Sequence, residues 1–555
     1  MITLLKSITK KEWLFVAFIS LVVILLTIAP LIYGFLIRPP DSIFTGTHFT
    51  PTNDWFVYYS HIEQARQGNF LFKNLYASEP HLPSLYLFWL GVGNLARIFN
   101  LSNIVAYNGV RIFLIPVFYF IAYLLIAYIF SDIKKRKISL LLLSFSSGLG
   151  VFFLGRIIKY PFNYANGQFN WPMDLWVPES NTFLTLYYSG HFITSLILIL
   201  VIFLLTMLFV DNKKFIYGLW AGSATLTLIT FHPFHLLTVF SVILVYFVLL
   251  TIREKKILWH LIFYYLTLGL FSLPPTLYFL YLLRVDWVTS IRAIQNMCFT
   301  TPLWLTFFSY GLLIIFALLG FYFLFKEKGG KNLFYSNKIL FILVWLMVQS
   351  LMIYFPVNFQ RRLSEGLHFP LVFFTTIGLF SLYTLINKRE NRLTEFLFNQ
   401  RYLLLLFLII FLPLSNLFQI AVDSFLYSDR RESSFAYLEK EAVEAATWLK
   451  TIPRDKIIFN SANNVINFIP AFSGRTVYVG HGVETPFFGE KQKEVDWFFA
   501  KNRPEEIERN FLIKRNIDYI FYSDDERKLG DYNPENKSYL KEVYSNPKVK
   551  IYQVL

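Results

Sequence analysis

An acidic and aromatic segment near the N-terminus, residues 52–68 with the sequence TNDWFVYYSHIEQARQG, contains the first side chain suited to chemistry, Asp54. Thr52 or Asn53 can cap a helix there and Gly68 can end it, so Asp54 falls in the first turn. A carboxylate at that position either stabilises the helix dipole or serves as a base toward a hydroxyl group. The aromatic residues share one side of this helix, which suits a helix lying along a membrane surface.

A second acidic segment follows a polar and aromatic loop and reads DLWVPESNT over residues 174–182. It carries Asp174 and Glu179, and His191 follows on the next apolar run. A tryptophan-rich loop can simply anchor a chain at the membrane interface. The alternative is that Glu179 converges with Asp54, one carboxylate acting as base while the other holds a cation or orients substrate.

Two histidines, His232 and His235, flank Pro233 within a long apolar stretch, residues 215–250. Proline removes a helical hydrogen bond, so two short helices meeting at a polar kink are expected. Ionisable groups in a membrane segment are costly to bury, which favours a function in substrate binding. Zinc is an alternative, but no third ligand lies nearby in the sequence. We therefore favour the interpretation that His232 and His235 are hydrogen-bonded polar groups beside a cavity.

Two arginines, Arg361 and Arg362, end the segment PVNFQRR at the close of another apolar run. The planar guanidinium group matches phosphate oxygens, which predicts a phosphate or pyrophosphate site. Snorkelling toward lipid headgroups is the alternative.

Near the C-terminus, His481 and Glu484 follow a predicted strand, where α/β sheets place ligand contacts. They are expected to contact donor or acceptor, or to join the tail to the membrane domain.

The elements that must position these residues are mainly membrane helices. Of 555 residues, 55% are hydrophobic and only 16% are charged, and repeated uncharged runs of about 18 or more residues require transmembrane helices. Eleven spans are predicted: Trp13–Ile37, Ile104–Phe130, Ile138–Gly155, Phe183–Val210, Phe215–Phe231, Pro233–Leu250, Ile257–Leu282, Leu303–Phe325, Ile339–Phe355, Leu367–Ile386 and Tyr402–Ala421. The stretch 83–99 is interpreted as an interfacial helix, because counting it as a span would invert every later basic hinge.

Basic residues gather in short hinges between the apolar runs, at 134–137, 213–214, 253–256, 326–331 and 388–392. This is the positive-inside pattern, which places the N-terminus in the cytoplasm and the C-terminus outside. The net charge of +15 is thereby explained without nucleic-acid binding, since no basic face with interleaved aromatic residues is evident. Cys298 is the only cysteine, so the chain can form no internal disulfide.

The chain changes character near residue 423. Strands are predicted over Lys456–Asn460, Thr476–Val479, Asp518–Ser523 and Val549–Leu555, and helices over Glu490–Lys501 and Glu505–Lys514. This alternation predicts a small α/β domain. On the helix predicted over 439–450, Ala442, Ala445, Ala446 and Leu449 share one face. The expected organisation is a transmembrane domain over residues 1–422, with a large outer loop (38–82) and the interfacial helix (83–99), followed by an extracytoplasmic α/β domain over 423–555.

The order of these segments resembles the GT-C superfamily of membrane glycosyltransferases, and the resemblance covers most of the chain. It rests on these segments: Asn53-Asp54-Trp55, His81-Leu82-Pro83 to Arg97, Arg111, Pro178-Glu179-Ser180-Asn181-Thr182-Phe183 before His191, His232-Pro233-Phe234, Gln360-Arg361-Arg362, and Gly480-His481 with Glu484-Thr485. No single piece is a strict signature.

The resemblance implies transfer of a sugar from a polyprenyl-phosphate donor to a glycan, lipid or protein acceptor of the cell envelope, at the outer face of the plasma membrane. Asp54 would match the base that acts on the acceptor hydroxyl, and Glu179, or less well Asp174, the second-loop carboxylate. Arg361 and Arg362 would hold the departing lipid phosphate. Asp54 and Glu179 are the candidate ligands of a divalent cation, and no other cofactor is implied.

Asp54 stands alone, where protein mannosyltransferases of this superfamily have paired acidic residues. This departure counts against a protein acceptor and against a firm metal requirement. The sugar-transfer hypothesis needs Asp54 and the arginine pair to face one extracytoplasmic cavity. A flippase or transporter for lipid-linked sugars, and a noncatalytic protein that binds envelope polymers, are the alternatives; a transporter commonly shows two related halves, and none are seen.

Overall fold

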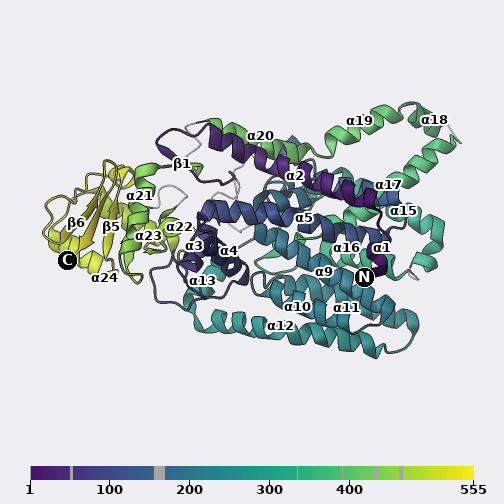
Figure 1. Cartoon of the computed structure of the whole chain (residues 1–555), viewed down its shortest axis with the longest axis horizontal. Helices are drawn as coiled ribbons and strands as arrows, with labels where there is room; N and C mark the ends of the chain where they lie inside the picture. Colours follow the sequence, from purple (N-terminus) through teal and green to yellow (C-terminus); the bar gives the residue numbers. More distant parts are fainter. Residues whose placement is uncertain are drawn as a thin grey trace. The chain divides into compact units, whose positions relative to one another are not determined.

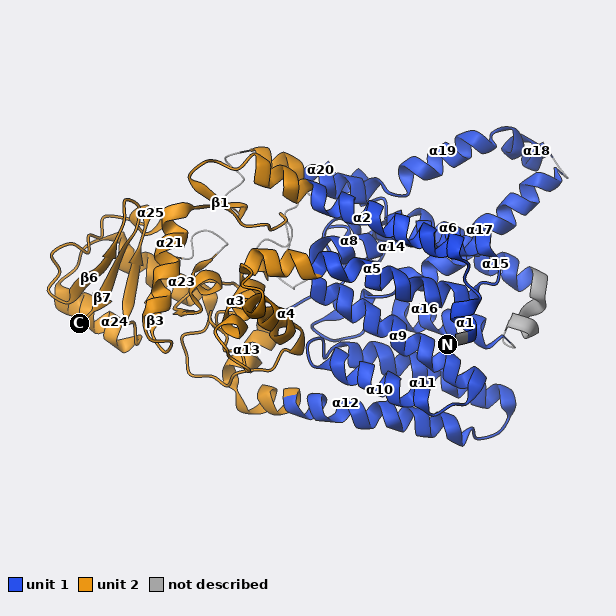
Figure 2. Cartoon of the chain, in the orientation of Figure 1, with its two compact units in different colours: residues 1–29, 111–278, 297–422 blue, residues 30–110, 279–296, 423–555 orange. Residues whose placement is uncertain are grey.

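The computed structural model describes residues 2–49, 54–155, 169–333, 336–389, 392–429, 435–461 and 467–555. The chain divides into two compact units, coloured blue and orange in Figure 2. Unit 1 comprises Met1–Ala29, Arg111–Tyr278 and Met297–Val422, and unit 2 comprises Pro30–Val110, Phe279–Asn296 and Asp423–Leu555. The outer loop predicted for residues 38–82 thus groups with the C-terminal residues in unit 2.

Unit 1 is mainly helical in the described part of the chain (Figure 1). Its helices are α1 (Ile2–Lys6), α2 (Lys10–Leu36), α5 (Asn103–Ile129), α6 (Ile133–Phe145), η1 (Gly150–Phe153), η2 (Met173–Leu175), α8 (Thr182–Tyr188), α9 (Gly190–Asn212), α10 (Ile216–Ile229), α11 (His235–Glu254), α12 (Trp259–Val285), α14 (Leu303–Tyr310), α15 (Leu312–Leu333), α16 (Asn337–Met352), η3 (Gln360–Ser364), α17 (His368–Lys388), α18 (Arg392–Asn399), α19 (Arg401–Phe411) and α20 (Leu414–Ser428). Four of these helices, α2, α5, α12 and α20, run across a boundary between the units.

Seven helical segments among the described residues are long and apolar enough to cross a membrane, and two bent helix pairs raise the number to nine. The seven correspond to α2, α5, α6 with η1, α9, α11, α12 and α17. Two further predicted spans, Phe215–Phe231 and Ile339–Phe355, are the shorter apolar helices α10 and α16. The stretch predicted as interfacial contains α4 (Leu87–Ile98), a helix of only 12 residues.

Three of the predicted spans are each interrupted by a break in the helix. The span from Leu303 bends by 82° between α14 and α15, because Gly311 adopts φ 48° and ψ −123°, a conformation that favours glycine. The span from Tyr402 is interrupted before α20 by Pro413, which cannot donate a helical hydrogen bond. The span from Phe183 breaks at Ser189, whose extended backbone separates α8 from α9.

The helices of unit 1 pack through small residues where their backbones come closest. On α15 and α17, Gly320 and Gly378 face each other so tightly that a Cβ on Gly320 would lie 1.9 Å from the carbonyl oxygen of Phe374. Small residues allow such close approach between membrane helices. This contact fixes α17 and, with it, the turn that precedes α17 in the chain.

Unit 2 combines helices with strands. Its elements are β1 (Ser42–Phe44), α3 (Asp54–Arg66), α4 (Leu87–Ile98), α13 (Trp287–Gln295), β2 (Tyr437–Glu439), α21 (Lys440–Trp448), η5 (Leu449–Thr451), β3 (Ile457–Phe459), α22 (Ile469–Ser473), β4 (Thr476–Val477), α23 (Phe488–Ala500), α24 (Glu505–Lys514), β5 (Tyr519–Tyr522), α25 (Asp524–Arg527), β6 (Leu540–Ser545) and β7 (Lys550–Val554). The predicted helices and strands of the tail are confirmed, whereas β2, α22, α25 and β6 were not predicted.

A five-stranded sheet with the order β4-β3-β5-β7-β6 forms the centre of the tail. The first three strands are parallel, and β7 is antiparallel to both β5 and β6. Successive side chains point to opposite faces of the sheet: Ile458 packs with the alanines of α21 on one face, and Phe459 packs with Phe498 of α23 on the other. The predicted apolar face of α21 is confirmed.

Helix α3 confirms the helix predicted after Asn53, but its surroundings differ from those of a helix lying on a membrane surface. Most of its side chains are buried within unit 2, including Trp55, Tyr59 and Ile62. It packs against α4 and α22, while the nearby strand β1 pairs antiparallel with β2. The first outer segment and the tail therefore share one core in unit 2.

Candidate functional site

Unit 1 gathers seven polar residues that we call the unit 1 polar cluster. They come from the loop before α8, the first turn of α9, the break between α10 and α11, and the turn before α17: Glu179, His191, His232, His235, Arg361, Arg362 and Glu365. Every residue of unit 1 predicted to bind substrate or catalyse, except Asp174, belongs to this cluster. Glu365 was missed, because it lies in no motif and only its charge within an apolar stretch could have drawn attention to it.

The break at Ser189 determines where His191 lies. A continuous helix from Phe183 would place His191 about two turns from its start, whereas the structure places His191 in the first turn of α9. Its Nδ1 lies 2.6 Å from the Ser189 hydroxyl, and its ring centroid lies 5.1 Å from that of His232.

Glu365 is the centre of the cluster and is fully buried. The Ser195 hydroxyl donates a short hydrogen bond to its Oε1, and His235 Nε2 lies 2.6 Å from its Oε2. His232 Nδ1 lies 3.9 Å from the same Oε2. The turn carrying Glu365 is held by Gln349 of α16, whose amide donates to the carbonyl of Glu365 at 2.6 Å.

The two arginines lie on η3, partly buried. The Arg361 guanidinium stacks on Trp176 at 4.3 Å and on Phe169 at 4.8 Å, and Arg362 lies 5.3 Å from the ring of Phe234. Among the described residues, Arg361 Nη1 is buried with no hydrogen-bond acceptor. A buried guanidinium donor with no acceptor is suited to an anionic ligand.

Glu179 is buried beside these arginines. Burial raises the pKa of the Glu179 carboxyl, while the positive charges of Arg362 and Arg361 oppose that rise. The carboxylate therefore shares the electrostatic field of the two guanidinium groups.

Asp174 has a different environment. Its Oδ2 accepts a hydrogen bond from the backbone amide of Gly150 at 3.0 Å, and burial raises the pKa of Asp174 to about 7. These contacts indicate that it joins η2 to η1, so its contact with substrate stays a prediction.

In unit 2, Asp54 begins α3, and its carboxylate Oδ1 lies 3.3 Å from His481 Nε2. His481 Nδ1 accepts from the backbone amides of Val483 at 3.2 Å and Glu484 at 3.1 Å. Because Nδ1 is an acceptor, the neutral ring carries its hydrogen on Nε2, which faces Asp54. The Asp54 side chain is 42% exposed and that of His481 only 6%, so an open carboxylate is contacted by a fixed imidazole.

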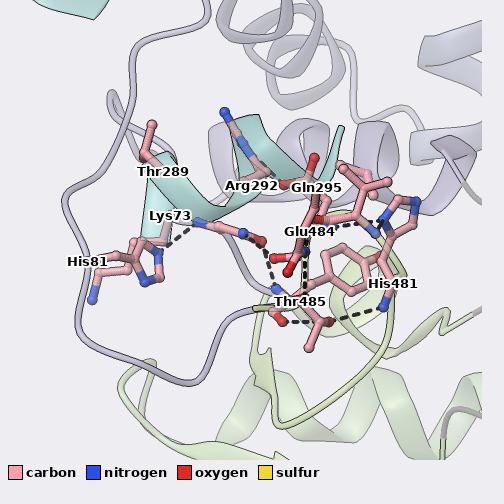
Figure 3. A network of polar contacts seen from close by, with 12 residues as sticks. Lys73, His81, Thr289, Arg292, Gln295, His481, Glu484 and Thr485 are labelled. Atoms are coloured by element: carbon pink, nitrogen blue, oxygen red, sulfur yellow. Dashed lines mark hydrogen bonds and ion pairs between the residues drawn. The ribbon is translucent and has the colours of Figure 1, made fainter. Parts of the chain in front are cut away.

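The loop carrying His481 is held by a polar network, part of which Figure 3 shows. Gln295 of α13 donates to the carbonyls of Val483 at 3.0 Å and Thr485 at 3.1 Å, and Arg292 of the same helix pairs with Glu484 at 3.1 Å. The charge of Glu484 raises the pKa of Arg292. Glu484, predicted to bind substrate, is thus engaged in an ion pair that fixes the loop.

Two sets of residues are candidates for binding a metal ion. The predicted pair, Asp54 and Glu179, is divided between the units, with Asp54 in unit 2 and Glu179 in unit 1. Within the described ranges, one group of three histidine or acidic residues could hold an ion: His232, His235 and Glu365, whose ligand atoms all lie within 4.8 Å of one another.

Solved structures are similar to this chain. The apo oligosaccharyltransferase of Archaeoglobus fulgidus aligns over 93% of this chain and 70% of its own, with a TM-score of 0.52 and 13% identity. The same organism's oligosaccharyltransferase AglB, in complex with an inhibitory peptide and a dolichol-phosphate, aligns over the same shares with a TM-score of 0.51 and 12% identity. ArnT from Cupriavidus metallidurans, bound to undecaprenyl phosphate, covers 98% of both chains with a TM-score of 0.46 and 10% identity.

No family model matches the chain, and no curated protein sequence matches it. The likeness to the two oligosaccharyltransferase structures shows a shared fold, as the order of motifs led us to expect. Together with the apolar helices, it identifies a multi-pass membrane protein.

Proposed function

We propose that this protein is a glycosyltransferase that moves a sugar from a polyprenyl-phosphate donor to an acceptor of the cell envelope, at the outer face of the plasma membrane. The observation that carries the proposal is the pair Arg361 and Arg362 within the unit 1 polar cluster, on a fold shared with an oligosaccharyltransferase. One of those neighbours holds a dolichol-phosphate, a lipid phosphate of the class proposed as the donor here.

The arginine pair suits the leaving group of such a reaction. The acceptor oxygen forms a bond to the anomeric carbon of the sugar as the bond from that carbon to the phosphate oxygen breaks. The phosphate then gains one negative charge as it departs. Guanidinium groups fixed by aromatic stacking can stabilise that developing charge without reorganising.

Asp54 is assigned the role of base that takes the proton from the acceptor hydroxyl, and His481 the role of positioning residue. The exposed Asp54 carboxylate is open to an acceptor, and the fixed Nε2–H of His481 orients it. That Asp54 and the arginine pair act on one donor and acceptor stays a prediction. A lipid or glycan acceptor fits this chemistry best, because the lone Asp54 counts against a protein acceptor.

Phosphate recognition by the arginines is tested by lipid binding in detergent, measured by native mass spectrometry with undecaprenyl phosphate and with undecaprenol. The double variant Arg361→Gln/Arg362→Gln is expected to bind undecaprenyl phosphate at least about tenfold more weakly, because each charged hydrogen bond contributes about 1.5–3 kcal/mol. Binding of undecaprenol should be unchanged.

Arg401→Gln is the matched control, since Arg401 belongs to unit 1 and also stacks on aromatic rings. It should bind both lipids as the wild type does. Equal affinity of the wild type for both lipids, or equal losses of both in the double variant, would contradict the assignment and favour a lipid-interface role for the two arginines.

A further inference from the structure

We infer that His232, His235 and Glu365 form a binding site for a divalent transition-metal ion, with zinc the best match. The ligand atoms are His232 Nδ1, His235 Nε2 and Glu365 Oε2. Two imidazoles and one carboxylate are a recurrent protein ligand set for zinc, with a fourth position open to water or substrate. The sequence offered the two histidines but no third ligand, and the fold supplies it from 130 residues further along the chain.

The geometry requires little rearrangement. Tetrahedral zinc with bonds of about 2.1 Å separates its ligand atoms by about 3.4 Å. Oε2 of Glu365 lies 2.6 Å from His235 Nε2 and 3.9 Å from His232 Nδ1. Each of these distances would change by less than about 1 Å on binding, a shift that side-chain rotation can supply.

His232 is the residue that distinguishes a metal site from an ordinary buried pair. Its side chain is only 5% exposed, and its Nδ1 has no hydrogen-bond partner among the described residues. A buried nitrogen without a partner is costly unless it binds something. The His235–Glu365 contact needs no help from His232, whereas a metal ion would use it.

The surroundings also suit an ion. The Ser195 hydroxyl donates to Oε1 of Glu365 and leaves Oε2 toward the two histidines; such outer contacts orient metal ligands. The rings of Phe192, Phe231 and Phe234 surround His232 with apolar groups.

The charges of the cluster indicate what the open position would take. Glu179 and Glu365 balance Arg361 and Arg362, so a divalent ion would add two positive charges. A departing polyprenyl phosphate carries two negative charges and would restore neutrality by placing an oxygen on the ion. This role at the open position rests on the proposed function, whereas metal binding itself does not.

Metal content of the full-length protein, purified in detergent without chelator, tests the inference. Elemental analysis for zinc, manganese, iron and cobalt is made before and after removal of metal with EDTA and reloading with one equivalent of zinc. The wild type should retain about one zinc ion per chain after desalting. His232→Gln should bind zinc at least about tenfold more weakly while keeping the thermal stability of the metal-free wild type.

His260→Gln is the control, since His260 lies on α12 outside the group of three ligands; it should retain zinc fully. Retention of zinc by His232→Gln and Glu365→Gln, or no metal in the wild type after reloading, would overturn the site. If zinc binds as expected but undecaprenyl phosphate binding is unaffected by the arginine variants, the metal site stands and the proposed function fails.

Discussion

His481 is predicted to serve two separable purposes through its two ring nitrogens, and two substitutions separate them. Nδ1 accepts from the amides of Val483 and Glu484, and Nε2 faces Asp54. In His481→Asn, the side-chain oxygen can replace Nδ1, but nothing replaces Nε2. In His481→Gln, the longer side chain can replace Nε2, but the acceptor for the two amides is lost.

The magnitudes follow from the contacts. Each amide hydrogen bond contributes about 1 kcal/mol, because the side chain of His481 is too buried for water to replace it fully. His481→Gln should therefore accelerate hydrogen exchange at Val483 and Glu484 about fivefold each, whereas His481→Asn should leave both rates near those of the wild type. Since the Asp54 carboxylate is well exposed, its contact with His481 adds little stability.

The assay is hydrogen–deuterium exchange on the peptide covering residues 480–487, combined with the rate of sugar transfer. His481→Asn should lower kcat about tenfold or more with normal exchange, because the base loses its orienting partner. His481→Gln should retain more activity despite faster exchange. If both variants lose activity in proportion to faster exchange, His481 is a structural residue of the loop, and its assignment as positioning partner of Asp54 is refuted.

Two further predictions concern the stability of unit 2. Gly93→Ala should destabilise the protein by about 1–3 kcal/mol in thermal unfolding, because the added Cβ would lie 2.2 Å from the Cβ of Ala65. Gly91→Ala on the same helix is the control, since a Cβ added at Gly91 would meet no atom within 4 Å. This control should be neutral or stabilising by up to about 1 kcal/mol. Burial lowers the pKa of His61 to about 4, so the unfolded chain binds the extra proton first, and stability should fall by up to about 3 kcal/mol as the pH drops from 6.5 to 4. His61→Phe should lose that part of the acid sensitivity, and an unchanged pH profile would contradict the burial argument.

Local sequence signals predicted the local structure of the tail and of α3 well. The face shared by Ala442, Ala445 and Ala446 is buried as expected, and α24 has the predicted bounds, Glu505–Lys514. Such features depend on residues a few positions apart, whose periodicity the sequence displays directly.

Features that depend on distant residues or on single breaks were not predicted. The average hydropathy of the chain stays high across Ser189 and Gly311, because one break among many apolar residues hardly changes a local average. Neither break therefore shows in the hydropathy pattern. Glu365 reaches His235 across 130 residues, and β1 pairs with β2 across nearly 400; no local pattern encodes such contacts. Asp54, Glu179 and the arginines were chosen as candidates from residue type and the order of motifs, while the neighbours of these residues required the structure.

The central claim is that Asp54 activates an acceptor while a lipid phosphate departs. The most direct measurement is the release of undecaprenyl phosphate by the protein in lipid nanodiscs. The substrates are a panel of undecaprenyl-phosphate monosaccharides with an envelope fraction as acceptor. We expect release by the wild type and at least about a hundredfold slower release by Asp54→Asn, which should still bind undecaprenyl phosphate. Release at equal rates from both proteins, or movement of the intact donor across the membrane without release, would contradict the account.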